Sequence, residues 1–172
     1  YRTQSILIDR NKNLWIGTAD HGLLVVHSNI IENQFFNLEP SDNSSIACWG
    51  SFEFENSLFA LTGEGVKELT SHTKPSPIEL LTRQNKLTSA CETDDFVLLG
   101  LATGGISKYQ NGRLTPVFYN KENVLDNTVL QILANEKGYL ACTKHSFLQL
   151  DTTGFFVKSI PYSSLGIGGY VM

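Results

Sequence analysis

A fourfold repeat of about 42 residues constrains the fold of this chain more than any other feature of its sequence. The first unit has an apolar run ending at Asp9, a polar turn, the run Leu14 to Thr18, and a third apolar run that follows Gly22. Shifts of 44, 83 and 125 residues bring similar runs onto this pattern. Self-similarity at such a period is typical of repeat architectures. The units span residues 1–43, 44–86, 87–126 and 127–165, and residues 166–172 resemble the start of a fifth.

Each unit is expected to contain four short β-strands and almost no helix. The alternating apolar runs predict strands at residues 4–9, 14–18, 23–27 and 33–38, at 46–53, 58–62, 66–69 and 78–81, at 89–92, 96–101, 106–109 and 114–119, and at 129–134, 139–143, 147–150 and 155–160. The pair Asn111-Gly112 predicts a two-residue hairpin. Residues 78–86 are the only candidate for a helix, and a strand is favoured there because the segment is short.

Four short antiparallel strands in each repeat are typical of an all-β fold built from β-propeller blades. One four-stranded blade cannot bury both of its faces, so neighbouring blades stack face to face around an axis. Four blades could close into a small propeller, but an open arc of a larger propeller is favoured. The apolar faces of the first and last blades would then be exposed, and the chain is expected to associate with another copy of itself through them.

Several repeated positions have an expected structural role. Asp9, Glu53 and Glu92 precede hairpin turns, where a carboxylate can accept hydrogen bonds from backbone N–H groups. Glycines at 22, 65 and 105 are expected to supply a positive φ before the third strand. Trp15 should fill the space between blades.

Cysteine count and composition exclude several classes of protein. The three cysteines, Cys48, Cys91 and Cys142, are an odd number without a C-x-x-C pair, which favours core residues over a disulfide framework or a zinc site. A net charge of −4 without a basic block argues against nucleic-acid binding. The densest apolar run, residues 96–102, is too short to span a bilayer. The chain starts inside a predicted strand with no signal peptide, so we expect a segment of a longer protein.

No catalytic, cofactor or metal-binding motif is present in the sequence, so the search for a site turns to ligand-binding loops. In a propeller the turns between second and third strands and the links between blades lie on one rim. The candidates on this rim, together with one aromatic residue on the innermost strand of the second unit, are Asp20, His21, Glu64, Arg83, Lys144, His145 and Trp49. Their mixed charges would suit an oligosaccharide or a sugar acid. The alternative is that they are ordinary solvated loop residues.

The segment from Asp9 to Leu23, DRNKNLWIGTADHGL, resembles the two-component-regulator propeller repeat. The other units keep parts of the pattern, such as Gly100, Gly105 and Thr143, but replace the tryptophan. The resemblance implies a non-catalytic, periplasmic sensor region of a bacterial hybrid two-component receptor, attached to the membrane through its parent chain. It also implies a histidine kinase or diguanylate cyclase output, control of transcription and a glycan-derived ligand.

Two other functions remain open. A propeller could be a scaffold for protein interactions, although the run Trp-Ile-Gly-Thr differs from the WD-repeat pattern. A glycan lyase or hydrolase would need two carboxylates that converge on the central channel. The repeated acids occupy equivalent turns, one per blade, and would be spread around the ring.

Overall fold

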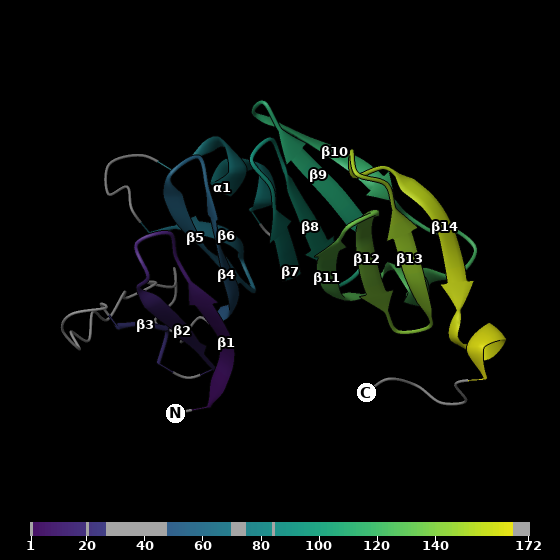
Figure 1. The fold of residues 1–172 in the computed structure, drawn as a ribbon, viewed down its shortest axis with the longest axis horizontal. Helices are drawn as coiled ribbons and strands as arrows, with labels where there is room; N and C mark the ends of the chain where they lie inside the picture. Colours follow the sequence, from purple (N-terminus) through teal and green to yellow (C-terminus); the bar gives the residue numbers. More distant parts are fainter. Residues whose placement is uncertain (1, 20, 27–47, 70–74, 84, 167–172) are drawn as a thin grey trace. The chain divides into compact units, whose positions relative to one another are not determined.

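A computed structural model describes residues 2–19, 21–26, 48–69, 75–83 and 85–166 of the chain. The chain divides into two compact units, residues 1–87 and 88–172, and the boundary falls at the start of β7 (Leu87–Glu92). Four antiparallel sheets follow one another along the sequence, two in each unit (Figure 1). The all-β class and the blade-like repeat are therefore confirmed.

The first unit contains two sheets with three strands each among the described residues. The first sheet has the order β1 (Thr3–Ile8), β2 (Leu14–Thr18) and β3 (Leu23–Val26). The second has the order β4 (Cys48–Phe54), β5 (Ser57–Thr62) and β6 (Gly65–Glu68), followed by helix α1 (Pro77–Thr82). The fourth strand predicted for the first repeat, residues 33–38, lies outside the described residues.

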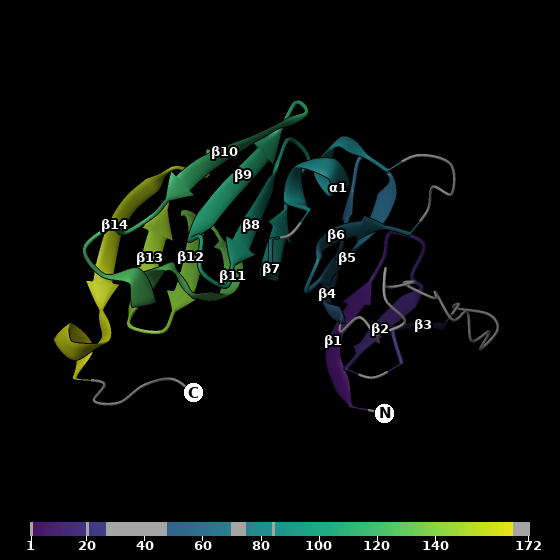
Figure 2. The ribbon, with the colours of Figure 1, turned by 180° about the vertical axis from the view of Figure 1, so that it is seen from behind.

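The second unit contains two complete four-stranded sheets. The third sheet pairs β7, β8 (Val97–Leu101), β9 (Ile106–Gln110) and β10 (Arg113–Phe118) in sequence order, and 3-10 helix η1 (Val124–Asn127) follows. The fourth pairs β11 (Val129–Asn135), β12 (Gly138–Thr143), β13 (Ser146–Leu150) and β14 (Phe156–Pro161), and η2 (Tyr162–Leu165) follows (Figure 2).

The prediction of a strand at residues 78–81 is wrong, because this segment forms α1. Ser76 caps the helix by accepting a hydrogen bond from the Glu79 amide at 3.4 Å, and Pro77 occupies the first turn. Proline at this position has the helical φ built in, and serine at the N-cap satisfies a free N–H group. These start signals outweigh the apolar run that suggested a strand.

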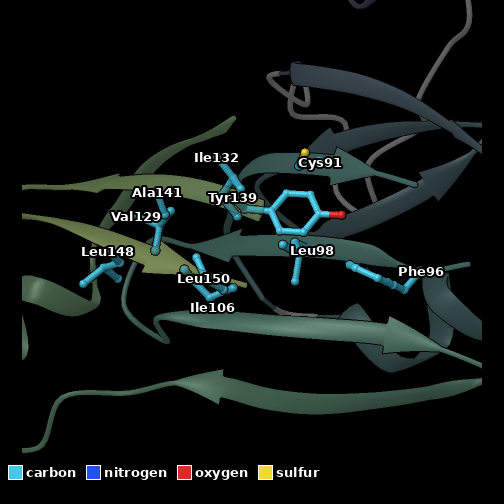
Figure 3. Close-up of a cluster of buried hydrophobic side chains, with 10 residues drawn as sticks. All are labelled: Cys91, Phe96, Leu98, Ile106, Val129, Ile132, Tyr139, Ala141, Leu148 and Leu150. Atoms are coloured by element: carbon cyan, nitrogen blue, oxygen red, sulfur yellow. The ribbon is translucent and has the colours of Figure 1, made fainter. Parts of the chain in front are cut away.

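Each unit has a cluster of buried apolar side chains between its two sheets. In the first unit, Leu7, Trp15, Leu23 and Val25 of the first sheet pack on one side against Cys48, Leu58, Ala60 and Leu69 of the second sheet and its edge. The register explains the set, because Leu7, Trp15 and Val25 are direct cross-strand partners and therefore share a face. In the second unit, the third and fourth sheets share a buried cluster that includes Leu98, Ile106 and Leu148 (Figure 3).

Turn chemistry follows the predicted pattern at two kinds of position. Arg113 pairs with Gln110, so Asn111 and Gly112 form a two-residue loop, and both have positive φ (51° and 73°). This confirms the predicted hairpin. The three glycines that precede third strands also have positive φ, at 70° (Gly22), 118° (Gly65) and 73° (Gly105).

Candidate functional site

The Asp9 turn between β1 and β2 is held by the carboxylate, as the sequence predicts. Asp9 accepts hydrogen bonds from the backbone N–H of Asn13 (2.8 Å), from the Asn13 side-chain amide (2.8 Å) and from the Trp15 indole N–H (2.9 Å). Burial raises the pKa of Asp9, but these hydrogen bonds outweigh it and hold the pKa below its ordinary value. The repeat acid and the repeat tryptophan therefore act as a pair, and Trp15 is a buried packing residue.

The other acids of this column have different contacts. Glu53 accepts a hydrogen bond from the Arg10 amide of the neighbouring turn at 3.4 Å. In the third repeat Thr93, the residue after Glu92, accepts from the Phe96 amide (2.9 Å) and donates to its carbonyl (2.9 Å). The prediction that a carboxylate accepts backbone hydrogen bonds is confirmed for Asp9 within its own turn, and Glu53 accepts one from the neighbouring turn. In the third repeat the Thr93 hydroxyl bonds the turn.

A buried threonine closes the turn between second and third strands in the first and second sheets. Thr18 Oγ1 donates to the Gly22 carbonyl (2.8 Å) and accepts from the His21 amide (3.0 Å). Thr62 Oγ1 donates to the Gly65 carbonyl (2.8 Å) and accepts from the Glu64 amide (3.1 Å). The repeat threonine thus fixes the backbone that presents a candidate rim side chain, His21 or Glu64.

A threonine closes the corresponding turn of the fourth sheet in the same way, and this turn is as long as that of the second sheet. Thr143 Oγ1 donates to the Ser146 carbonyl (3.0 Å) and accepts from the amides of His145 (3.2 Å) and Ser146 (3.0 Å). The third sheet has Leu101 at this position, and there the backbone bond from Leu101 N–H to the Gly105 carbonyl (2.9 Å) closes the turn. Lys144 is exposed at the tip of the fourth-sheet turn and His145 is half-buried beside it.

In the first unit, the end of α1 packs against the turn between β5 and β6. Thr82 Oγ1 accepts a hydrogen bond from the Val66 amide at 3.0 Å and donates to the Ile78 carbonyl at 2.8 Å. The α-carbon of Gly65 lies so close to the Thr82 carbonyl that a side chain could not be accommodated. Glu64 and Arg83 are both exposed and flank this contact. The structure therefore brings these two predicted rim residues to the same end of the unit.

In the second unit, the link between the third and fourth sheets is anchored by a buried polar network. Asn127 accepts from the Asn120 amide (2.7 Å) and donates to its carbonyl (2.8 Å). Asp126 accepts from the side chains of Asn120 (3.2 Å), Asn123 (3.2 Å) and Ser146 (3.3 Å). Since Ser146 follows Lys144 and His145 directly, the link and this turn lie at one end of the unit.

Tyr162 completes the network from the other side of the same turn. Its hydroxyl donates to the Thr143 carbonyl at 2.8 Å and lies 3.4 Å from the Cys142 sulfur. Burial raises the pKa of Tyr162, and the Cys142 contact and the Asp126 charge raise it further. Sequence reasoning missed Asp126, Asn127 and Tyr162. The asparagine-rich run from 120 to 127 is the signal that marks the link, while nothing local marks Tyr162.

Trp49 lies on β4, as predicted, at a bulge between Cys48 and Gly50 in the pairing of β4 with β5. The Lys86 ammonium lies 5.4 Å from the centre of its ring, a cation–π contact that the sequence did not indicate. The indole N–H is buried and has no hydrogen-bond partner among the described residues. An unpaired buried donor costs about 1–3 kcal/mol, so an oxygen acceptor from water or a ligand would be stabilised there.

The remaining candidates are placed as follows. His21 is exposed in the turn after β2, whereas Asp20 lies outside the described residues. Two groupings are present within single units: Glu64 with Arg83, and Lys144 with His145.

In the part of the chain that the structure describes, His, Cys, Asp and Glu side chains do not gather in groups of three that could hold a metal ion. The described helices are all shorter or more polar than a bilayer crossing requires.

Neither a protein-family model nor a curated protein matches the sequence, but solved structures match the fold. The extracellular domain of BT3049, assigned to a hybrid two-component system of B. thetaiotaomicron, is 21% identical with a TM-score of 0.72, over 94% of this chain and 23% of that one. The corresponding domain of BT4673 from the same organism is 21% identical with a TM-score of 0.65, over 93% and 21%.

An enzyme also has this fold. Virginiamycin B lyase from Staphylococcus aureus is 13% identical with a TM-score of 0.70, over 92% of this chain and 55% of the lyase. The chain spans less than a quarter of the length of the two receptor domains. The chain, with its four antiparallel sheets, has the fold of the extracellular domains of BT3049 and BT4673. This fold agrees with the resemblance of its sequence to the two-component-regulator propeller repeat.

Proposed function

We propose that the chain is a non-catalytic, ligand-sensing propeller segment of a bacterial two-component receptor. The observation that carries the proposal is the match, over 94% of the chain, to the extracellular domain of BT3049. The Asp9–Trp15 pair also supports the proposal, because both residues belong to the pattern of the two-component-regulator propeller repeat and are hydrogen-bonded to each other. The parent protein would place the segment in the periplasm, join it to the membrane and carry a histidine kinase output that regulates transcription.

The ligand that fits the candidate residues best is a glycan fragment or a sugar acid. Arg83 and Lys144 are exposed cations, and Trp49 with Lys86 combines an aromatic ring with a positive charge. Aromatic rings stack on sugars, and ammonium and guanidinium groups bind carboxylates through charge-assisted hydrogen bonds. The segment is also expected to associate with a second copy through its exposed blade faces.

The sensor proposal is tested by a binding screen with a matched pair of lysine variants. The chain is titrated with neutral and acidic oligosaccharides, and the melting temperature and calorimetric heat are measured. Lys144→Ala, at the rim turn, should weaken binding of an acidic sugar at least about tenfold, a change of about 1.4 kcal/mol. Lys137→Ala, in the exposed turn between β11 and β12, should leave the affinity unchanged.

Two results would assign another function. Because the fold is also similar to that of virginiamycin B lyase, the same sugars are incubated with the chain and assayed for new reducing ends or unsaturated products. Turnover that persists in purified protein would contradict the non-catalytic proposal. A chain that binds none of the sugars but whose melting temperature rises with a protein partner would be a scaffold.

A further inference from the structure

In three of the sheets the first strand carries a β-bulge at the same place. Directly beside the residue that pairs with the repeat threonine, the strand pairing skips one residue, which is Gln4 in β1, Trp49 in β4 and Leu130 in β11. A bulged residue has no partner in the strand ladder, and bulges often redirect a side chain next to a functional site. Gln4 and Leu130 are exposed, and Trp49 is half-buried.

The bulges of the first two sheets lie close together within the first unit. Ser5, which follows Gln4, and Cys48, which precedes Trp49, both border the α-carbon of Gly17. A Cβ atom at Gly17 would meet the Ser5 hydroxyl and would lie 3.6 Å from the Cys48 sulfur. Two bulges that are 45 residues apart in the sequence therefore share one end of the contact between β1 and β4.

Buried polar groups without partners gather at this end of the unit. The hydroxyls of Ser5 and Ser51 and the indole N–H of Trp49 are buried, and none of them has a hydrogen-bond partner among the described residues. Such groups are costly to bury, and in native proteins the protein itself, water or a ligand nearly always satisfies them. Three of them within two residues of the two bulges indicate a polar partner from outside the chain. We call Ser5, Trp49, Ser51 and Lys86 the bulge site.

The second unit shows the same arrangement closed by the chain itself. Gly100 takes the place of Gly17, and a Cβ atom there would border Val129 and Ser89 as it borders Cys48 and Ser5 in the first unit. Ser89 accepts a hydrogen bond from the Ile132 amide of the next sheet at 2.9 Å. Thr88 donates to the Val129 carbonyl at 2.6 Å. These bonds use the polar groups within the second unit, whereas the bulge site of the first unit keeps its hydroxyls available.

We propose that the bulge site binds the carboxylate-bearing unit of an acidic glycan. The proposal rests on the proposed sensor function and assigns its ligand a place and a chemical class. The Lys86 ammonium, exposed and 5.4 Å from the centre of the Trp49 ring, pairs with the carboxylate. The exposed part of the ring contacts the C–H groups of the sugar.

Donor groups decide the class of ligand. The ammonium and the indole N–H can only donate hydrogen bonds, so the site favours a ligand rich in acceptor oxygens. The buried indole N–H and the two serine hydroxyls reach the ligand through ordered water, which bridges polar groups almost as well as a direct bond. A carboxylate meets this demand better than a neutral sugar hydroxyl, because hydrogen bonds to an ionised acceptor are stronger.

The test is calorimetric titration of the chain with oligogalacturonate and with alginate and heparin fragments, each compared with its carboxyl-reduced neutral form. An acidic form should bind at least about tenfold more tightly than its reduced form. Lys86→Met should remove this preference, because it keeps most of the stem and loses the charge. Lys137→Met, in the exposed turn between β11 and β12, is the matched control and should keep it. Trp49→Phe should weaken the binding of both forms.

Tryptophan fluorescence locates the ligand independently, because the chain has only two tryptophans. In Trp15→Phe all tryptophan emission comes from Trp49, and the acidic sugar should change it. In Trp49→Phe the emission of Trp15 should stay constant, and circular dichroism checks the fold of each variant. Acidic sugars that bind equally well to the unmodified, Lys86→Met and Trp49→Phe chains would overturn the bulge site but leave the sensor proposal standing. Equal affinity for acidic and reduced forms would overturn the carboxylate class, and a chain that binds none of the sugars would contradict both proposals.

Discussion

The indole N–H of Trp15 donates a hydrogen bond of 2.9 Å to a carboxylate oxygen of Asp9, across the turn that joins β1 to β2. The same carboxylate accepts from the amide and the side chain of Asn13. In the other repeats, where Phe59, Leu98 and Leu140 replace the tryptophan, the acid position holds glutamate or alanine. A pair that contacts directly in one repeat is thus altered at both positions in the other three.

A double-mutant cycle on this pair should reveal coupling. Asp9→Asn should lower the free energy of unfolding by about 1–2 kcal/mol, because a carboxylate that accepts three hydrogen bonds is replaced by an amide. Trp15→Phe removes the indole donor and some packing. We expect a coupling energy of about 1 kcal/mol from urea unfolding followed by far-ultraviolet circular dichroism. Strictly additive effects would contradict a direct Asp9–Trp15 contribution to stability.

The stability of the first unit should fall in acid through the Asp9 carboxylate. Its pKa in the folded chain lies below the ordinary value of 3.8, so the folded form binds its proton less readily than the unfolded form. The stabilisation is therefore complete well above 3.8, begins to be lost as the pH approaches that value, and is lost fully once the pH falls below the folded pKa. In the second unit, Asp151 also has a lowered pKa, through hydrogen bonds from Thr153 and Phe155, and the stability of that unit should change with pH in the same direction. The free energy of unfolding is measured against pH for the unmodified chain and for Asp9→Asn, and the difference between the two curves is the contribution of Asp9. Parallel curves would contradict a contribution of the Asp9 carboxylate to acid sensitivity.

Much of the fold could be predicted from residues whose effect is local. Asn111-Gly112, Gly105 and Asp9 each impose a turn through their own backbone or side chain, and the structure has those turns. The short apolar run at residues 78–81 predicts a strand, but Ser76 and Pro77 start a helix there. The helix start signals outweigh the apolar pattern.

The candidate site could be predicted less fully, because long-range packing decides it. Asp126 and Ser146 are 20 residues apart and meet only after the link folds onto the fourth sheet. The contact between Lys86 and Trp49 likewise depends on the path of the chain after α1. Neither pair has a sequence spacing that is typical of a known motif.

The buried threonine of the fourth-sheet turn should contribute to stability through its hydroxyl. Thr143→Val keeps the shape of the side chain but leaves the Ser146 carbonyl and amide without their partner. The expected loss is about 1–3 kcal/mol in urea unfolding. Thr115→Val, at an exposed position on the edge strand β10, is the control and should change stability by less than about 0.5 kcal/mol. Equal effects of the two variants would mean that the turn hydroxyl is dispensable.

Two cysteines should resist thiol reagents in the folded chain. Burial raises the pKa of both Cys48 and Cys91 to about 11, and the charge of Glu92 adds to the effect at Cys91. At pH 8 only about one thiol in a thousand would then be ionised, and the thiolate is the reactive form. Alkylation followed by mass spectrometry should label both residues slowly in buffer and quickly in urea. Fast labelling of either in the folded chain would contradict its burial.

Two glycines with the same φ of +73° allow the effect of backbone strain to be separated from that of close packing. At Gly112 a Cβ atom would meet nothing within 4 Å, so Gly112→Ala should lose only the cost of the left-handed conformation, about 1–2 kcal/mol. At Gly105 the same atom would overlap the Phe118 carbonyl oxygen. Gly105→Ala should therefore be less stable than Gly112→Ala by at least about 2 kcal/mol, since the β9–β10 end of the third sheet must shift to relieve the overlap. Urea unfolding of the two variants measures this difference, and equal stabilities would show that the link after β10 moves freely away from Gly105.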